Sequence, residues 1–509
     1  NPKLEEKGQC VMICKRQQGA MKLSVVMLVL FAGLGAPRGW GPMTGNAGAA
    51  APPGGQPSTA VSSMSASSVQ NPFLGSTPSG KASPEVLHLS IASAIQRGLR
   101  FNLGTLLSEQ SSQSARGARW QALSQLLPHV NAGVTETLQQ INLEALGFPP
   151  TLSKAFPGFP VIVGPFGTFD ARASLTAPLL DLHSLHQVHA ASDDVRAAEY
   201  SYQDARNMVV LVVGNAYLLA SAAQALVRSA QAEVNTAQAL YQQATDRLHA
   251  GLSPQIDELR AEVELKTQQE QLLTAQNAFA TDKLNLARVI GLPSGQAFVL
   301  SSETTYAPLQ GVTIQQALAE AYQNRPDYKA ALVQVRAAEQ ARRAAIDERL
   351  PSISFNTNFG DIGLTPANSH ETFAVAGTLS IPIFQGGRVH GDLIQANAQL
   401  KQSEDQLQNL KAQIDYDVRT SLLNLTTAAG QVSVARSNVA LAHQTLQQAR
   451  DRFAAGVTDN IEVVEAQQAV ANADETYISS LYQHNLAKVS LARAIGVADR
   501  AVMQYLGGR

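Results

Sequence analysis

Polar and apolar residues alternate along four short stretches of the chain, two in each half. In the second half, the run from Ser352 to Phe359 places Ile353, Phe355 and Phe359 on one face, because successive side chains of a strand point to opposite sides. The run from Phe373 to Ile383 alternates in the same way. A loop rich in Gly, Pro and Asn separates these runs, so the pattern predicts a strand hairpin.

The first half contains an equivalent pair of runs, from Pro128 to about Leu138 and from Phe169 to Leu179. Each is about ten residues long, with one apolar and one polar face, as in strands of outer-membrane barrels. A half-buried sheet in a soluble protein has the same pattern. The strands alone therefore leave both interpretations open.

Two much longer segments follow the strand pairs. From His183 to Ala250 there is no Pro and one Gly, and Ala, Gln, Leu and Glu dominate; such a composition predicts a continuous helix. A helix of that length is a rod of about 100 Å. The segment from Gln385 to Ala455 has the same character, and returning helices are expected over Gln255 to Ile290 and Asn460 to Ile495.

The second half repeats the first in register. The segment from Gln242 to Gly251 corresponds to the segment from Gln447 to Gly456, and 456 minus 251 gives an offset of 205 residues. The same offset relates Leu286–Gly291 to Leu491–Gly496. Shared helical composition would not keep Asp, Arg and Gly in register over this distance, so we interpret the halves as a duplication.

The predicted fold is mainly α with a small β part, each half being a strand hairpin followed by a long helical hairpin. Four strands cannot close a membrane barrel, which needs about eight. An open sheet edge cannot lie in lipid, because its backbone groups would find no hydrogen-bond partners there. If the strands span a membrane, several chains must therefore share one barrel.

Several short motifs, together with their order and duplication, resemble the TolC-like outer-membrane efflux proteins. They are Asn324–Asp327, Leu350–Pro351, Ile381–Arg388 and the two blocks ending at Gly251 and Gly456. The resemblance covers residues 85–499 and implies a homotrimer whose subunits each give four strands to a shared 12-stranded barrel. An α-helical tunnel through the periplasm would continue this barrel. Repeat 1 is then expected over residues 85–312, repeat 2 over 313–499 and a tail over 500–509.

The resemblance also implies a gate at the periplasmic end of the tunnel. By register from the turn glycines, Glu462 and Glu465 match the acids that ring the pore, and they lie one helical turn apart. Asp257 matches an acid that links neighbouring hairpins. The usual partners of this acid are an aromatic hydroxyl and an Arg, whereas this chain has Phe453 and Thr458 there. The closing link is therefore expected to be weaker or differently built, with Asp459 or Arg260 as candidate contributors. The simpler alternative is that Glu462 and Glu465 are solvated helix-surface acids.

Other residues are expected to contribute at turns. Gly251, Gly456, Arg247 and Arg452 would form the hairpin tips that contact a periplasmic adaptor. Gly386 and Gly387 supply a permissive backbone where a strand passes into a helix.

The N-terminal region predicts export. Met21-Lys22 is followed by an apolar run too short to span a bilayer as a helix, so residues 21–47 are expected to be a secretory signal peptide; a short anchor is the alternative. Residues 1–20 would be an upstream extension or reflect a misplaced start. Residues 48–84, rich in Gly, Ala, Ser and Pro, are expected to be a flexible linker. Beyond the signal, no run of 18 consecutive apolar residues is found, which argues against helical membrane spans.

Composition excludes other classes of function. A net charge of −2 and a pI near 6.6 leave no basic excess for nucleic acid. The two cysteines, Cys10 and Cys14, have no partners that would complete a metal site. His183, His186 and His189 could share a metal, but a water-facing start of a helix is the preferred interpretation. No catalytic or nucleotide-binding motif occurs, so we expect neither an enzyme nor a cofactor.

The expected function is passive exit through the outer membrane of a Gram-negative bacterium, in contact with outer-membrane lipid. An inner-membrane transporter, joined through a periplasmic adaptor (membrane fusion) protein, would supply the energy and choose the substrate, in tripartite efflux or type I secretion. The alternative from another class is a soluble periplasmic coiled-coil adaptor or scaffold; an exported hydrolase is a third possibility, for which no site is found.

Overall fold

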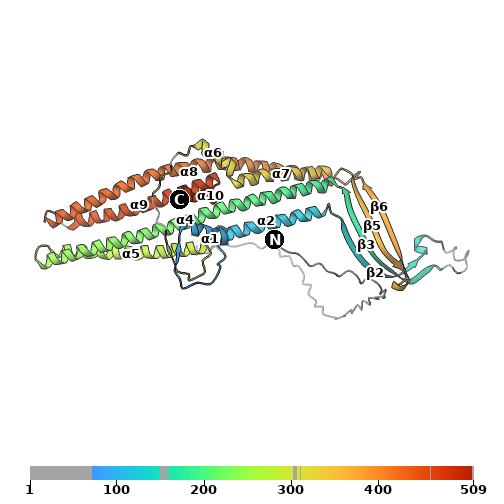
Figure 1. The fold of residues 1–509 in the computed structure, drawn as a ribbon, viewed down its shortest axis with the longest axis horizontal. Helices are drawn as coiled ribbons and strands as arrows, with labels where there is room; N and C mark the ends of the chain where they lie inside the picture. Colours follow the sequence, from blue (N-terminus) through green and yellow to red (C-terminus); the bar gives the residue numbers. More distant parts are fainter. Residues whose placement is uncertain are drawn as a thin grey trace, which may run out of the picture. The chain divides into compact units, whose positions relative to one another are not determined.

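A computed structural model describes residues 71–149, 158, 160–301, 306–309, 311–458 and 460–506. All of them belong to one unit, Ser67–Arg509. Long helices run side by side, with a small antiparallel sheet at one end and the two tight turns that connect the paired long helices at the other (Figure 1). The predicted signal peptide and the residues before it lie outside the described residues.

Repeat 1 begins with short elements and ends in a hairpin of two long helices. Its elements are β1 (Leu87–Leu89), α1 (Ile91–Phe101), α2 (Leu103–Ser124), β2 (His129–Asn142), β3 (Ile162–Leu180), α4 (Leu182–His249), α5 (Gln255–Val289) and β4 (Phe298–Leu300).

Repeat 2 has the same order of two short helices, two long strands and two long helices, and it ends in a short helix where repeat 1 ends in a short strand. Its elements are α6 (Ile314–Asn324), α7 (Pro326–Asp347), β5 (Ser352–Gly363), β6 (Ser369–Ser380), α8 (Arg388–Ala454), α9 (Asn460–Ile495) and α10 (Ala498–Tyr505). Short 3₁₀ turns are η1 (Pro72–Leu74), η2 (Glu144–Leu146) and η3 (Pro366–Asn368).

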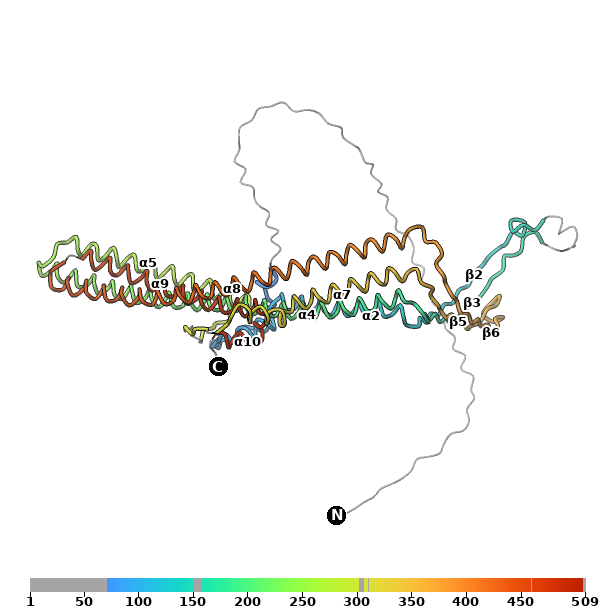
Figure 2. The backbone as a smooth tube through the Cα atoms, turned by 90° about the horizontal axis from the view of Figure 1, so that it is seen from above, coloured from blue at the N-terminus to red at the C-terminus, as the bar shows by residue number. Residues whose placement is uncertain are grey.

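The two strand hairpins join into one antiparallel sheet with the order β2-β3-β5-β6. The junction is the pairing of β3 with β5, in which Ala173 lies opposite Phe359. Strands β2 and β3 are longer than expected and continue pairing past a register shift to Asn142 and Ile162, so they extend beyond β5 and β6 (Figure 2).

The predicted end of the last strand is wrong by three residues, because β6 stops at Ser380 rather than at Ile383. Pro382 has no N–H to donate to a strand ladder, which explains why pairing ends here. Ile383 and Phe384 follow as exposed side chains.

Each long helix ends at a glycine with positive φ. At the first tip, the N–H groups of Gly251 and Leu252 donate to the carbonyl groups of Leu248 and Arg247. The same pair of bonds recurs 205 residues later at Gly456, and again at the far end of α9 at Gly496. At Gly291, the far end of α5, the N–H of Leu292 donates to the Ala287 carbonyl group in the same way. These are Schellman ends, in which a left-handed residue closes the last helical turn, and glycine takes that conformation without steric cost.

The main core lies where both repeats meet around the middle of α4. Its buried members include Val209, Val213, Tyr217 and Leu218 of α4 together with Leu286 of α5. Among the described helices, α4 is the one long and apolar enough to cross a membrane by length and composition, and half of its most apolar window is buried inside the protein. Its apolar residues from Val209 to Ala220 contribute to this core, which accounts for their hydropathy without a membrane.

The end of the predicted flexible linker and the predicted tail both make contacts with the helices. In the predicted linker, the Thr77 N–H donates to the Phe101 carbonyl oxygen, and Phe73 packs against the main core. In the predicted tail, residues 500–505 belong to α10, and Val502 is buried in the main core. The mainly α, duplicated fold is confirmed, with more order at these two boundaries than composition indicated.

Candidate functional site

The four-stranded sheet has one apolar and one polar side. The register places Val130, Leu175, Thr357 and Val375 in one row across the strands, and Ala132, Ala173, Phe359 and Phe373 in the next row on the same side. The large apolar residues most exposed on this side are Val130, Val134, Leu138, Phe359, Phe373, Val375 and Leu379, and each is at least 59% exposed. The opposite side is lined mainly by polar residues, including Asn131, Thr135, Arg172, Ser174, Asn356, Asn358 and Thr378.

The length and the apolar character of this side of the sheet match a lipid-facing surface. The stretch from Ile353 to Phe359 covers roughly 20 Å at strand spacing, close to the apolar band of about 25 Å that surrounds outer-membrane barrels. A soluble sheet would bury such a side against a second layer. Here the side chains remain exposed, so the sheet is built for an apolar solvent.

The polar side carries one ion pair at its centre. Arg172 of β3 donates two hydrogen bonds to Asp170, two residues earlier on the same strand. Arg172 lies between Gly133 and Gly360 in the register, and a Cβ at Gly360 would approach the Arg172 Cα to 2.6 Å. The glycine therefore allows the backbones of β3 and β5 to approach closely at this position.

The histidines at the start of α4 contact the end of α7. His183 Nδ1 lies 2.9 Å from the Ala344 carbonyl oxygen and 3.7 Å from a Glu348 carboxylate oxygen, and His186 Nδ1 lies 3.4 Å from an Asp347 carboxylate oxygen. Both side chains are partly buried, so the expected water-facing helix start is wrong for these two residues, although His189 is exposed. Among the described residues, no group of three or more His, Cys, Asp or Glu could hold a metal.

Where strand passes into helix before α8, Gly386 and Gly387 both have positive φ, at 61° and 87°. Gly387 is the N-cap residue of α8. Nothing lies within 4 Å of an added Cβ at either position. The glycines are therefore needed for backbone conformation and not for close packing.

Glu462 and Glu465, the two expected ring acids, differ in their surroundings. Glu462 is partly buried and pairs with Arg452 across the second hairpin, at 2.7 Å, and with the Thr458 hydroxyl group. Glu465, one turn later on α9, is exposed. Glu462 thus has charged and polar partners within its own hairpin, whereas the carboxylate of Glu465 is exposed on the surface of the chain.

Asp257 is buried at the start of α5, and its carboxylate lies 3.8 Å from the guanidinium of Arg260, one of the two candidate contributors that the sequence indicated. Its backbone carbonyl oxygen accepts a 3.1 Å hydrogen bond from the buried amide of Asn460 on α9. This bond joins the two hairpins. Sequence reasoning missed Asn460, because nothing in the local pattern distinguishes it from other helix N-termini; Asp459 lies outside the described residues.

A second contact also joins the hairpins near their tips. Arg247 of α4 donates a 2.8 Å hydrogen bond to the Phe453 carbonyl oxygen and places its guanidinium 4.5 Å from the centre of the Phe453 ring. Phe453 is itself buried in a small core that includes Leu240, Leu446 and Val463. A phenylalanine suffices for this cation–π contact, since the ring face carries the attraction. Phe453, which lacks the hydroxyl group usual at this position in the resembled family, thus joins the hairpins through its ring and its backbone carbonyl.

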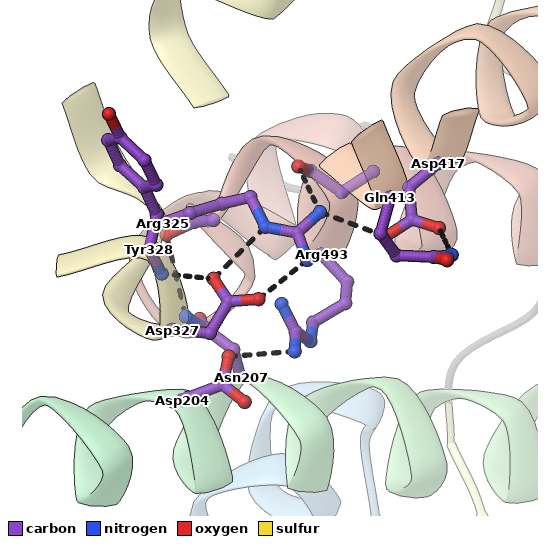
Figure 3. A network of polar contacts seen from close by, with 10 residues as sticks. Asp204, Asn207, Arg325, Asp327, Tyr328, Gln413, Asp417 and Arg493 are labelled. Carbon is purple, nitrogen blue, oxygen red and sulfur yellow. Dashed lines mark hydrogen bonds and ion pairs between the residues drawn. The ribbon is translucent and has the colours of Figure 1, made fainter. Parts of the chain in front are cut away.

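Farther from the tips, a buried arginine ties α7 to α8 and α9 (Figure 3). Arg325 contacts Asp327 at 2.6 Å, Asp417 of α8 at 3.0 Å and the Ala494 carbonyl oxygen of α9 at 3.3 Å. Arg493 of α9 pairs with Asp204 of α4 at 2.7 Å beside it. Burial opposes the charge on both partners, yet their mutual bonds raise the pKa of Arg325 and lower the pKa of Asp327.

Repeat 1 fills the equivalent position with an asparagine. The buried amide of Asn102 donates to the Val289 carbonyl oxygen, as Arg325 donates to that of Ala494; Val289 and Ala494 are 205 residues apart in the sequence. The duplicated backbone has thus kept one acceptor position, while the donor has diverged. Among the described residues, the donor extends into a charged network in repeat 2 and not in repeat 1.

A sheet with a lipid-type side, continued by paired helical hairpins, defines a membrane channel-tunnel class of protein. The model of the outer membrane efflux protein family matches residues 107–292 and 317–497. The chain therefore belongs to the outer membrane efflux protein family, and it is a protein of the Gram-negative outer membrane.

Relatives and solved structures agree with this assignment. The outer membrane protein TolC of Escherichia coli is 22% identical over 347 residues, which are 65% of this chain and 69% of that protein. The alkaline protease secretion protein AprF of Pseudomonas aeruginosa is 21% identical, over 67% of this chain and 72% of that protein. The Campylobacter jejuni CmeC outer membrane channel has the same fold, with a TM-score of 0.70 and 16% identity over 84% of this chain and 92% of that one. These similarities support the channel and not the soluble adaptor, and the family consists of channels rather than enzymes.

Proposed function

We propose that three copies of this chain form a passive channel through the outer membrane for small molecules or secreted substrates. The observation that supports this proposal best is the exposed apolar side of the β2-β3-β5-β6 sheet, which matches lipid. Its outer strands β2 and β6 have one partner strand each within the described chain. In lipid their open edges must pair with other copies, and three copies would supply 12 strands.

Exposed apolar residues on the helices support the same assembly. The contacts within the chain order its helices as α5, α4, α9 and α8 along the two hairpins, so α5 and α8 form the edges. Leu273 and Leu284 are exposed on α5, and Leu423, Val434 and Leu441 are exposed on α8. Pairing the α5 edge of one copy with the α8 edge of the next would bury these residues and close a tunnel.

The hairpin tips are the proposed gate and adaptor surface. Leu252 and Val457 are exposed beside Gly251 and Gly456, and such apolar tips suit contact with a helical partner. An adaptor that displaces the tips would have to break the Arg247–Phe453 and Asn460–Asp257 contacts, since both join the two hairpins. Arg452 would meanwhile hold Glu462 in place within its own hairpin.

Single-channel conductance tests the channel and its acidic ring separately. The purified protein in planar bilayers is expected to form cation-selective pores as a heat-resistant trimer. Glu465→Gln should lower cation selectivity and block by divalent cations, and Glu462→Gln should add a smaller effect, because Arg452 already offsets its charge.

The matched control is Glu404→Gln, an acid on α8 paired with Lys401 and remote from the tips. If the double variant Glu462→Gln, Glu465→Gln retains the selectivity of the control, the ring assignment is wrong while the channel stands. A protein that stays soluble without detergent and forms no pores would overturn the channel proposal itself.

A further inference from the structure

A cavity of about 380 Å³ lies between α4, α5 and α9, away from the tips and from the sheet. Its lining includes three acids, one from each helix: Glu233 of α4, Glu270 of α5 and Glu475 of α9. No lysine or arginine lines it. The cavity therefore has the negative charge of a cation site. Acids alone are common on helix surfaces, but two residues of this lining are also buried.

The first of these residues, Glu233, is unusual because it is only 7% exposed. A buried carboxylate is stable when it has a cationic partner or stays protonated. The charges around Glu233 are mostly negative, with Asp474 on α9 and Glu264 on α5, against Arg450 on α8. Burial first, and then Asp474, raises the pKa of Glu233 from 4.5 to about 7.

The second residue, Gln268 of α5, is fully buried and lines the same cavity. Its side-chain nitrogen donates a 2.9 Å hydrogen bond to Glu264, but its Oε1 accepts none. A buried amide oxygen without a donor costs about 1 to 3 kcal/mol. The lining of the cavity therefore includes two acceptors, one amide oxygen without a donor and one carboxylate.

We propose that this cavity binds a small organic ammonium ion, with N–H groups donating to the Glu233 carboxylate and to Gln268 Oε1. An ammonium group supplies the positive charge and the hydrogen-bond donors that both acceptors lack. The apolar part of the ligand would lie against Leu226 and the alanines of the lining. A divalent metal fits less well, because no group of three or more metal-ligating side chains occurs among the described residues.

Binding would hold three helices together. The ligand contacts α4 and α5 of the first hairpin and approaches α9 of the second, so it should stabilise the pairing of the two hairpins. Affinity should rise with pH from 6 to 8, because Glu233 must be ionised to bind a cation. With a pKa of about 7, roughly one tenth of the carboxylate is charged at pH 6, so affinity should be about tenfold weaker there than at high pH.

Isothermal titration calorimetry of the full-length trimer in detergent, with n-butylammonium chloride as the probe, tests this proposal. We expect one site per chain at pH 8, at least tenfold weaker binding in Glu233→Gln, and unchanged binding in Glu262→Gln, an acid of α5 outside the cavity lining. Gln268→Leu should also weaken binding. Tetraethylammonium, which has no N–H donor, should bind far more weakly than butylammonium.

Equal affinity of the wild type and Glu233→Gln would overturn the proposal, as would equal binding of the two ammonium ions. Absence of butylammonium binding at pH 8 would show that Glu233 binds a proton but no ammonium ion, and would also overturn the proposal. If Glu233→Gln fails to fold, the pH dependence and the comparison of the two ions in the wild type still decide the question. Because calorimetry does not measure conduction, a negative result leaves the channel proposal untouched.

Discussion

At the scale of single residues, Arg325 shows how one side chain can hold several helices. Its side chain is 4% exposed and contacts Asp327, Asp417 and the carbonyl oxygen of Ala494. A buried arginine is stable only when its donors find such acceptors, and its planar group can reach three at once. Its loss would leave two carboxylates and one carbonyl group without their shared donor.

We expect Arg325→Met to lower the free energy of unfolding by roughly 2 to 4 kcal/mol, because both acids lose the buried charge that stabilises them. Thermal unfolding of the detergent-solubilised protein would measure this effect. Arg419→Met is the control, since Arg419 forms an exposed pair with Asp415 on one helix and should leave stability almost unchanged, because solvent screens exposed ion pairs. Similar losses in both variants would contradict the role assigned to Arg325.

At the scale of elements, the two helical hairpins depend on backbone conformation at their turns. Gly456 has a φ of +73°, whereas Gly430 lies inside α8 with a helical backbone. Neither has an atom within 4 Å of an added Cβ. The two glycines therefore differ in conformation and not in available space, which makes them a matched pair.

Alanine substitution at these two positions should have opposite effects on stability. Gly456→Ala should destabilise by about 1 to 2 kcal/mol, because a Cβ disfavours the left-handed conformation. Gly430→Ala should stabilise by up to about 1 kcal/mol, because alanine favours a helix. Melting temperatures of the two variants measure both effects, and a shift of the same sign in both would refute this explanation of the turn.

At the scale of the whole molecule, the four-stranded sheet carries the surface that is suited to lipid. Its apolar side is continuous only because β3 pairs with β5 and brings the two repeats into one register. Without that junction there would be two separate hairpins with narrow apolar faces. The duplication therefore contributes more than repetition, since the sheet needs both copies.

Introducing a charged residue on one or the other side of strand β6 tests which side of the sheet faces lipid. Val375→Arg should cost about 2 to 4 kcal/mol in lipid near the middle of the apolar band, and should reduce the yield of heat-resistant trimers in outer membranes. Ala376→Arg, on the adjacent residue and the opposite side, should be tolerated much better. Equal yields of the two variants would mean that the apolar side does not face lipid.

Local physics explains why so much of this fold could be predicted from the sequence. Strand alternation, long runs of helix formers and glycines at turns depend on neighbours a few residues apart, and the helix bounds of α4, α5, α8 and α9 agree with the expected ones to within about three residues. The offset of 205 residues also required no structure. The mainly α fold followed from these features, whereas the family and the outer-membrane location followed from the resemblance that the short motifs carry.

Tertiary structure alone decided which distant residues meet. The union of β3 with β5, the contacts of Arg325, the Arg247–Phe453 contact between hairpins and the burial of Glu233 involve partners far apart in the sequence. Periodicity predicts which side of a helix is polar, but it does not predict which polar side chain becomes buried and loses its hydration. That loss depends on how helices pack, and it is what changes the pKa of Glu233 and leaves the oxygen of Gln268 without a donor.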